Sequence, residues 1–155
     1  MALLFENSAV IPVLCIIGLM LYLSRQIKRD SLILVIGLMI ALLFEYMMVK
    51  LELIGFNTHP YPLWFVLLWS ALLLTINTSM QFIARLPWYS AIAVCALFAP
   101  MSYWAGARFE VITIAEPLWF FWLVYGLAWA AMFNFIIFVN NKVALYVAPA
   151  KPHNN

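Results

Sequence analysis

The chain has 155 residues, of which 68% are hydrophobic and 9% are charged, whereas a soluble domain is close to half apolar and about a quarter charged. This composition argues against a soluble globular domain, a disordered chain and a coiled coil. The formal net charge is only +2, and no long basic cluster is present, so nucleic acid is not an expected partner.

Apolar runs dominate the chain, and five of them suit a membrane crossing, which takes about 20 helical residues. In chain order they are Ala9–Leu23, which is short and contains Pro12, then Ser31–Val49, which can extend to Ile54, Leu63–Ile83, Trp88–Gly106 and Leu118–Val139. The runs are continuous rather than alternating, and lipid requires every backbone polar group to be satisfied internally. The predicted fold class is therefore all-α, a polytopic transmembrane helix bundle with five spans.

The segments between these runs are short. Pro62, Pro87 and Pro117 each stand just before a run, where a missing backbone N–H costs nothing. Tryptophan and tyrosine gather at the ends of the runs, as in the aromatic belts of membrane proteins. We therefore expect one transmembrane domain, residues 1–140, followed by a polar cytoplasmic tail, residues 141–155, with the lipid bilayer as the surrounding partner.

The distribution of lysine and arginine predicts an orientation. With five spans, Lys50 and Arg108 fall on the side of the N-terminus. Six basic residues fall on the opposite side: Arg25, Lys28, Arg29, Arg85, Lys142 and Lys151. The positive-inside rule places the larger group in the cytoplasm, so the N-terminus is expected outside and the C-terminus inside.

Small residues recur at helical spacing on three of the predicted spans. Such stripes let membrane helices approach closely, and they predict which way each helix faces. The stripes are Gly37, Ala41 and Glu45 on the second span, Ala91, Cys95, Ala99, Ser102 and Gly106 on the fourth, and Gly126, Ala130 and Asn134 on the fifth.

Glu45 is the most informative residue of the sequence. An ionised carboxylate in hydrocarbon is costly, so such a residue usually turns inward and often has a function. One interpretation is an acid, a proton site or a ligand contact. A second is a structural carboxylate paired with Lys50, Arg108 or a tyrosine such as Tyr103. In a third, the span ends early and Glu45 meets the interface.

Polar residues also gather towards the cytoplasmic end of the third span. They are Thr75, Asn77, Thr78, Ser79 and Gln81, and Asn134 of the fifth span should lie at a similar depth. The favoured interpretation is hydrogen bonding between helices, and the alternative is a polar pocket or pathway. The candidate polar pocket comprises Glu45, Thr75, Asn77, Ser79, Tyr103, Arg108 and Asn134, with Glu45 as the candidate catalytic group.

Metal and cofactor chemistry finds no support in the sequence. His59 and His153 lie outside the apolar runs, and Cys15 and Cys95 lie singly within them. No residue set has metal-ligand or haem spacing, and no glycine-rich nucleotide loop is present. We expect no metal and no cofactor.

Two stretches carry a resemblance to a known family. They are residues 62–69, Pro-Leu-Trp-Phe-Val-Leu-Leu-Trp, followed by Thr75 and Ser79, and residues 99–108, Ala-Pro-Met-Ser-Tyr-Trp-Ala-Gly-Ala-Arg. With an acid in the second span, they resemble a family of small bacterial inner-membrane proteins known only as a domain of unknown function. The resemblance extends from about Leu32 to Phe138. It implies a bacterial inner membrane and supplies no reaction.

Three classes of function fit these observations. The first is an inner-membrane accessory or assembly protein, with a membrane-protein partner or a second copy of itself, because the sequence shows no catalytic constellation. The second is a membrane-embedded enzyme acting on a lipid or isoprenoid, with Glu45 as general acid. The third is a transporter or channel subunit, which five spans without an inverted repeat do not favour.

Overall fold

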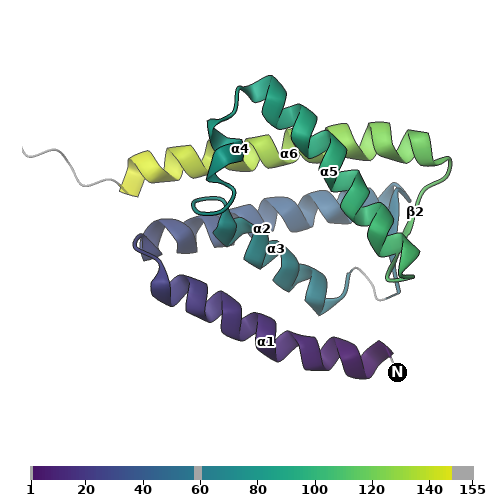
Figure 1. Ribbon diagram of the computed structural model, residues 1–155, viewed down its shortest axis with the longest axis horizontal. Helices are drawn as coiled ribbons and strands as arrows, with labels where there is room; N and C mark the ends of the chain where they lie inside the picture. Colours follow the sequence, from purple (N-terminus) through teal and green to yellow (C-terminus); the bar gives the residue numbers. More distant parts are fainter. Residues whose placement is uncertain (1, 58–60, 148–155) are drawn as a thin grey trace, which may run out of the picture.

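The computed structural model describes the backbone of residues 2–57 and 61–147, which form a mostly helical chain (Figure 1). The helices and strands are α1 (Ala2–Leu23), α2 (Ile27–Lys50), β1 (Ile54–Phe56), α3 (Leu63–Thr75), α4 (Gln81–Arg85), α5 (Trp88–Arg108), β2 (Ile112–Ile114) and α6 (Leu118–Val147). The helical fold class agrees with the prediction. The two short strands were not predicted.

Successive long helices run in alternating directions. Figure 1 places the start of α1 and the β1–β2 pair at one end of the molecule, and the α1–α2 turn and the end of α6 at the other. In order of packing, α1 contacts α3, α3 contacts α2, α2 contacts α6, and α6 contacts α5. The end at which β1 (Ile54–Phe56) pairs with β2 (Ile112–Ile114) is called the ribbon end. The opposite end is called the basic end, and it holds Arg25, Lys28, Arg29, Arg85 and Lys142.

Three helices are long and apolar enough to cross a membrane, namely α2, α5 and α6. They support a membrane protein, as the composition predicts. Two further apolar helical stretches, Val10–Leu23 and Leu63–Thr75, are shorter. The expected number of five spans therefore stays a prediction.

The third apolar run is not one helix. We expected it to continue from Leu63 to Ile83, but α3 ends at Thr75 and α4 begins only at Gln81. The Thr75 hydroxyl donates to the Leu72 carbonyl at 2.6 Å, and the amide of Met80 returns to the Thr75 carbonyl at 2.9 Å. Threonine, asparagine and serine in this stretch compete for backbone hydrogen bonds, which explains the break.

The last helix is longer than expected. It continues beyond Val139 to Val147, so the first seven residues of the predicted tail are helical. Residues 148–155 lie outside the described residues. The segment after Val139 contains Asn140, Asn141 and Lys142, but apolar residues recur up to Val147, and the helical pattern of burial continues through them.

The predicted stripes of small residues mostly lie inside. Ala91, Cys95 and Ala99 are buried, whereas Ser102 is exposed and donates to the carbonyl of Phe98. Ser102 was therefore wrongly placed on the packed face. Gly126 of α6 is buried because α5 comes so close that an added Cβ would lie 2.6 Å from the Ala96 carbonyl oxygen.

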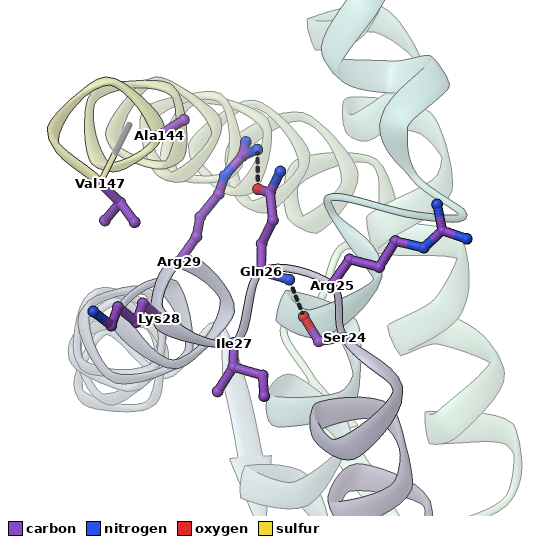
Figure 2. A pocket seen from close by; sticks show the side chains of 8 residues that line it. All are labelled: Ser24, Arg25, Gln26, Ile27, Lys28, Arg29, Ala144 and Val147. Carbon is purple, nitrogen blue, oxygen red and sulfur yellow. Dashed lines mark hydrogen bonds between the residues drawn. The ribbon is translucent and has the colours of Figure 1, made fainter. Parts of the chain in front are cut away.

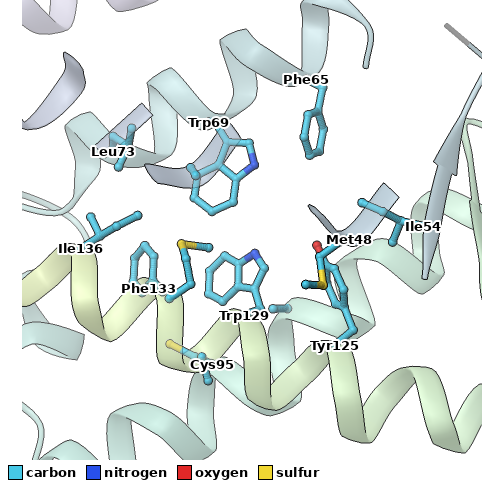
Figure 3. Close-up of a cluster of buried hydrophobic side chains, with 14 of the residues drawn as sticks. Met48, Ile54, Phe65, Trp69, Leu73, Cys95, Tyr125, Trp129, Phe133 and Ile136 are labelled. Carbon is cyan, nitrogen blue, oxygen red and sulfur yellow. The ribbon is translucent and has the colours of Figure 1, made fainter. Parts of the chain in front are cut away.

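Aromatic side chains fill the space between α3 and α6. The rings of Trp69 and Trp129 stack with centroids 5.6 Å apart, and Trp129 stacks on Phe133 at 4.9 Å (Figure 3). Burial of such large apolar surfaces stabilises contacts between helices. At the ribbon end, β1 and β2 pair antiparallel, with Ile54 opposite Ile114, and so join the loop after α2 to the loop after α5.

Candidate functional site

Glu45 is fully buried, with no exposed surface, and it points inward from α2. This is the direction predicted from its position on the Gly37 and Ala41 face. The Tyr103 hydroxyl of α5 donates to its Oε1 atom at 2.5 Å. The Tyr125 hydroxyl of α6 lies 3.1 Å from both carboxylate oxygens. One carboxyl group therefore joins three helices.

Aromatic rings enclose this carboxyl group. Tyr103 and Tyr125 have ring centroids 4.7 Å apart, Phe121 stacks on Tyr125 at 5.0 Å, and the edge of Phe65 meets Tyr103 at 6.2 Å. Phe121 and Tyr125 are fully buried. The described surroundings of Glu45 are therefore aromatic, and their polar groups are the two tyrosine hydroxyls and the indole of Trp69.

The basic residues considered as partners of Glu45 lie elsewhere. The ammonium group of Lys50 lies 5.5 Å from the ring centre of Tyr46, and the guanidinium of Arg108 lies 5.3 Å from that of Trp104. Both side chains are exposed. Of the three partners proposed from the sequence, only Tyr103 hydrogen bonds with Glu45.

Tyr125 is a site residue that the sequence analysis missed. A tyrosine in the middle of an apolar helix usually has a hydrogen-bond partner for its hydroxyl when it is buried. That rule, together with its place directly before Gly126, was the available signal. The sequence places most tyrosines at the ends of the apolar runs and suggests Tyr103 as a tyrosine partner of Glu45.

A second polar cluster lies at the basic end. Asp30 at the start of α2 is 9% exposed and accepts hydrogen bonds from the Ser24 hydroxyl at 2.5 Å and from the Asn77 amide at 2.9 Å. Asn77 also exchanges two hydrogen bonds with Asn140 of α6, at 3.2 and 2.9 Å. The cluster connects the α1–α2 turn, the turn after α3, and α6.

Asp30 and Asn140 were also missed as site residues. In the sequence, Asp30 lies in the segment between the first two apolar runs, and Asn140 is the residue directly before the predicted tail. Asp30 lies in the first turn of α2, where a negative charge is favourable, and Asn140 lies where α6 continues beyond the expected end. The sequence alone did not indicate that these two residues belong to one cluster with Asn77.

The residues of the candidate polar pocket do not meet in one place. Thr75 and Asn134 donate to carbonyls of their own helices, at Leu72 and Ala130, and Ser79 is exposed. Glu45 and Asp30 are fifteen positions apart on α2, about 22 Å at 1.5 Å per residue. Glu45 and Tyr103 form one cluster, and Asn77 belongs to the other.

Within the residues that the structure describes, no three His, Cys, Asp or Glu side chains gather closely enough to hold a metal ion. The chemistry of the Glu45 cluster is that of a carboxyl group with two hydroxyl donors. Such a group can accept hydrogen bonds, or hold a proton, between three packed helices.

Comparison with family models assigns the chain to a family. The model of a protein family of unknown function, DUF2878, matches residues 1–135. The chain belongs to the DUF2878 family. This match confirms the resemblance to a family of unknown function that the two sequence stretches indicated. The DUF2878 match contains Glu45, Tyr103 and Tyr125, whereas Asn140 lies beyond it. Comparisons with curated proteins and with solved structures give no match.

Proposed function

We propose that this DUF2878 protein is a non-catalytic accessory or assembly protein of the bacterial inner membrane, acting with a membrane-protein partner or a second copy of itself. The observation that carries the proposal is that the Glu45 carboxyl group is fully buried and hydrogen bonded within the protein. Both carboxylate oxygens are bound by tyrosine hydroxyls, and Glu45 has no exposed surface. A sealed carboxyl group serves to hold α2, α5 and α6 together.

We further propose five spans, with the N-terminus outside and the C-terminus in the cytoplasm. The alternating helix directions support this topology (Figure 1). So does the charge distribution among the described residues, because Arg25, Lys28 and Arg29 lie at one end together with Arg85 and Lys142, while Lys50 and Arg108 lie at the other. The basic end is then cytoplasmic.

Purification of the tagged full-length chain from its native membrane in mild detergent tests the accessory role. The expected result is a stoichiometric membrane-protein partner, or a defined homo-oligomer, that survives gel filtration. A tagged, unrelated membrane protein of similar size is the control for nonspecific capture. Recovery of the chain as a lone monomer at every mild detergent concentration contradicts the proposal.

A membrane-embedded enzyme acting on a lipid or isoprenoid is the second candidate. It is favoured by one feature of the cluster: among the described residues Glu45 has hydroxyl partners and no ion pair, a setting in which a carboxyl group can keep a proton for general acid catalysis. Lipid analysis of a deletion strain distinguishes the two. An altered lipid profile that the wild-type gene restores and the Glu45→Gln gene does not would support the enzyme.

A further inference from the structure

A cavity of about 670 Å³ opens at the basic end, between the first turn of α2 and the last turn of α6 (Figure 2). Its lining residues are Ser24, Arg25, Gln26, Ile27, Lys28, Arg29, Ala144 and Val147. Three of these eight side chains are cationic, and none is acidic. Among the described residues, no lining carboxylate neutralises the positive charge of this cavity.

Asp30 does not line this cavity but lines the adjoining one, which shares Arg25, Gln26 and Arg29 with it. Asp30 follows Arg29 directly, but its two carboxylate oxygens bind Ser24 and Asn77. The acid thus belongs to the polar cluster between the helices, and it forms no ion pair with the three cations of the cavity.

Arg29 is the central side chain of the cavity. It is partly buried, and its Nη1 atom donates to the Gln26 side-chain oxygen at 3.2 Å. Its Nε atom is buried and has no hydrogen-bond partner within the described residues. A buried guanidinium N–H without an acceptor is costly, so an anionic oxygen would satisfy a donor that the protein leaves free.

The remaining groups around Arg29 suit the same ligand. Arg25 and Lys28 are exposed, and their side chains extend to opposite sides of Arg29 (Figure 2). Among the described residues, no side chain caps the first turn of α2, whose free N–H groups favour an anion. Ile27, Ala144 and Val147 supply apolar surface next to these cations. Cations and apolar surface side by side match an amphiphile with an anionic head.

We propose that this cavity binds the phosphate of an anionic lipid headgroup, with Arg29 as its main ligand. Arginine binds phosphate through paired hydrogen bonds, and basic pockets between membrane helices bind anionic headgroups. The inference requires that α2 and α6 cross the membrane, which puts the cavity at headgroup depth. It does not depend on the accessory role.

Native mass spectrometry of the full chain in detergent tests the proposal with short-chain phosphatidylglycerol, phosphatidylcholine and inorganic phosphate as separate probes. We expect one phosphatidylglycerol to bind in preference to phosphatidylcholine. Arg29→Gln should weaken that binding about tenfold or more, because a charge-assisted hydrogen bond is lost. Arg85→Gln is the matched control, since it removes one charge from the same end outside the cavity.

If Arg29→Gln does not fold, the double variant Arg25→Gln/Lys28→Gln replaces it, with Arg85→Gln/Lys142→Gln as its control. Equal binding by the cavity variant and the wild type overturns the proposal. So does an equal loss in the control, which would indicate diffuse attraction. If inorganic phosphate binds in an Arg29-dependent way but phosphatidylglycerol does not bind, the proposed lipid site is wrong and the cavity is a site for free phosphate.

Discussion

The hydroxyl of Tyr125 lies 3.1 Å from each of the two carboxylate oxygens of Glu45. The residues are eighty positions apart in the chain and come from α6 and α2, and Tyr103 of α5 adds the third helix. The surroundings of these three polar groups are aromatic, so Glu45 is the carboxylate acceptor that both tyrosine hydroxyls share. The stability of the bundle should therefore respond strongly to changes in this cluster.

Replacement of Glu45 by alanine should destabilise the protein by about 1–3 kcal/mol, since two tyrosine hydroxyls lose their acceptor in a buried site. Glu45→Gln should lower the free energy of unfolding by a smaller amount, because the amide keeps an acceptor oxygen and the length of the side chain. Unfolding by heat or SDS in detergent measures both variants. Equal stability of Glu45→Ala and the wild type would contradict a structural role.

Removal of a single hydroxyl gives a finer test of the same cluster. Tyr125→Phe should lower the free energy of unfolding by about 0.6–1.7 kcal/mol, which are the average and the largest value for hydrogen bonds between membrane helices. Tyr22→Phe is the matched control, because Tyr22 is 81% exposed and should have almost no effect. Chemical unfolding in mixed micelles provides the comparison, and similar losses in the two variants would argue against the cluster.

The polar cluster at the basic end makes a separate prediction. Asn77→Ala removes the hydrogen bonds to Asp30 and Asn140, which should destabilise the protein by about 1–3 kcal/mol because buried polar groups lose their partners. Asn134→Ala is the control, since within the described part of the chain the Asn134 amide hydrogen bonds only with the Ala130 carbonyl of its own helix. If Asn134→Ala lowers the thermal stability as much as Asn77→Ala does, the hydrogen bonds of Asn77 between segments do not stabilise the protein more than a hydrogen bond within one helix.

The positions of α2, α5 and α6 could be predicted because each forms one long, continuous hydrophobic run. The runs beginning at Trp88 and Leu118 start at the same residues as α5 and α6. The direction of Glu45 could also be predicted, because Gly37 and Ala41 mark the packed face. These inferences use only periodicity along one helix and the cost of exposing a carboxyl group to lipid.

The sequence could not predict which residues from different helices meet. Asn77 of the third predicted span and Asn134 of the fifth carry the same side chain, yet one binds Asp30 and the other a carbonyl of its own helix. That difference depends on the break after Thr75, which turns Asn77 towards α2. Hydropathy does not register such a break, because Ile76 and Met80 keep the run apolar. The β1–β2 pairing has the same long-range origin.

Because α5 and α6 lie so close at Gly126, adding one methyl group there should clearly lower the stability of the protein. Gly126→Ala should destabilise the protein by about 1–3 kcal/mol, because the added methyl group would lie 2.6 Å from the Ala96 carbonyl and 2.8 Å from Pro100 Cγ. Gly18→Ala is the matched control, with no atom within 4 Å of the added methyl group, and helix propensity favours it slightly. Thermal unfolding should rank Gly18→Ala at or above the wild type and Gly126→Ala clearly below it.

The orientation prediction rests on the separation of basic residues between the two ends. A C-terminal fusion to alkaline phosphatase should be inactive, and a fusion to a cytoplasmic fluorescent protein should be bright, because the positive-inside rule holds the basic end in the cytoplasm. Truncated fusions at Asn57 and at Glu110, both in loops at the ribbon end, should give active phosphatase. An active phosphatase at the C-terminus would reverse the orientation. The five-span topology places three crossings between Asn57 and the C-terminus, so the two fusions should give opposite phosphatase signals. Equal signals would require an even number of crossings there and would exclude the five-span topology.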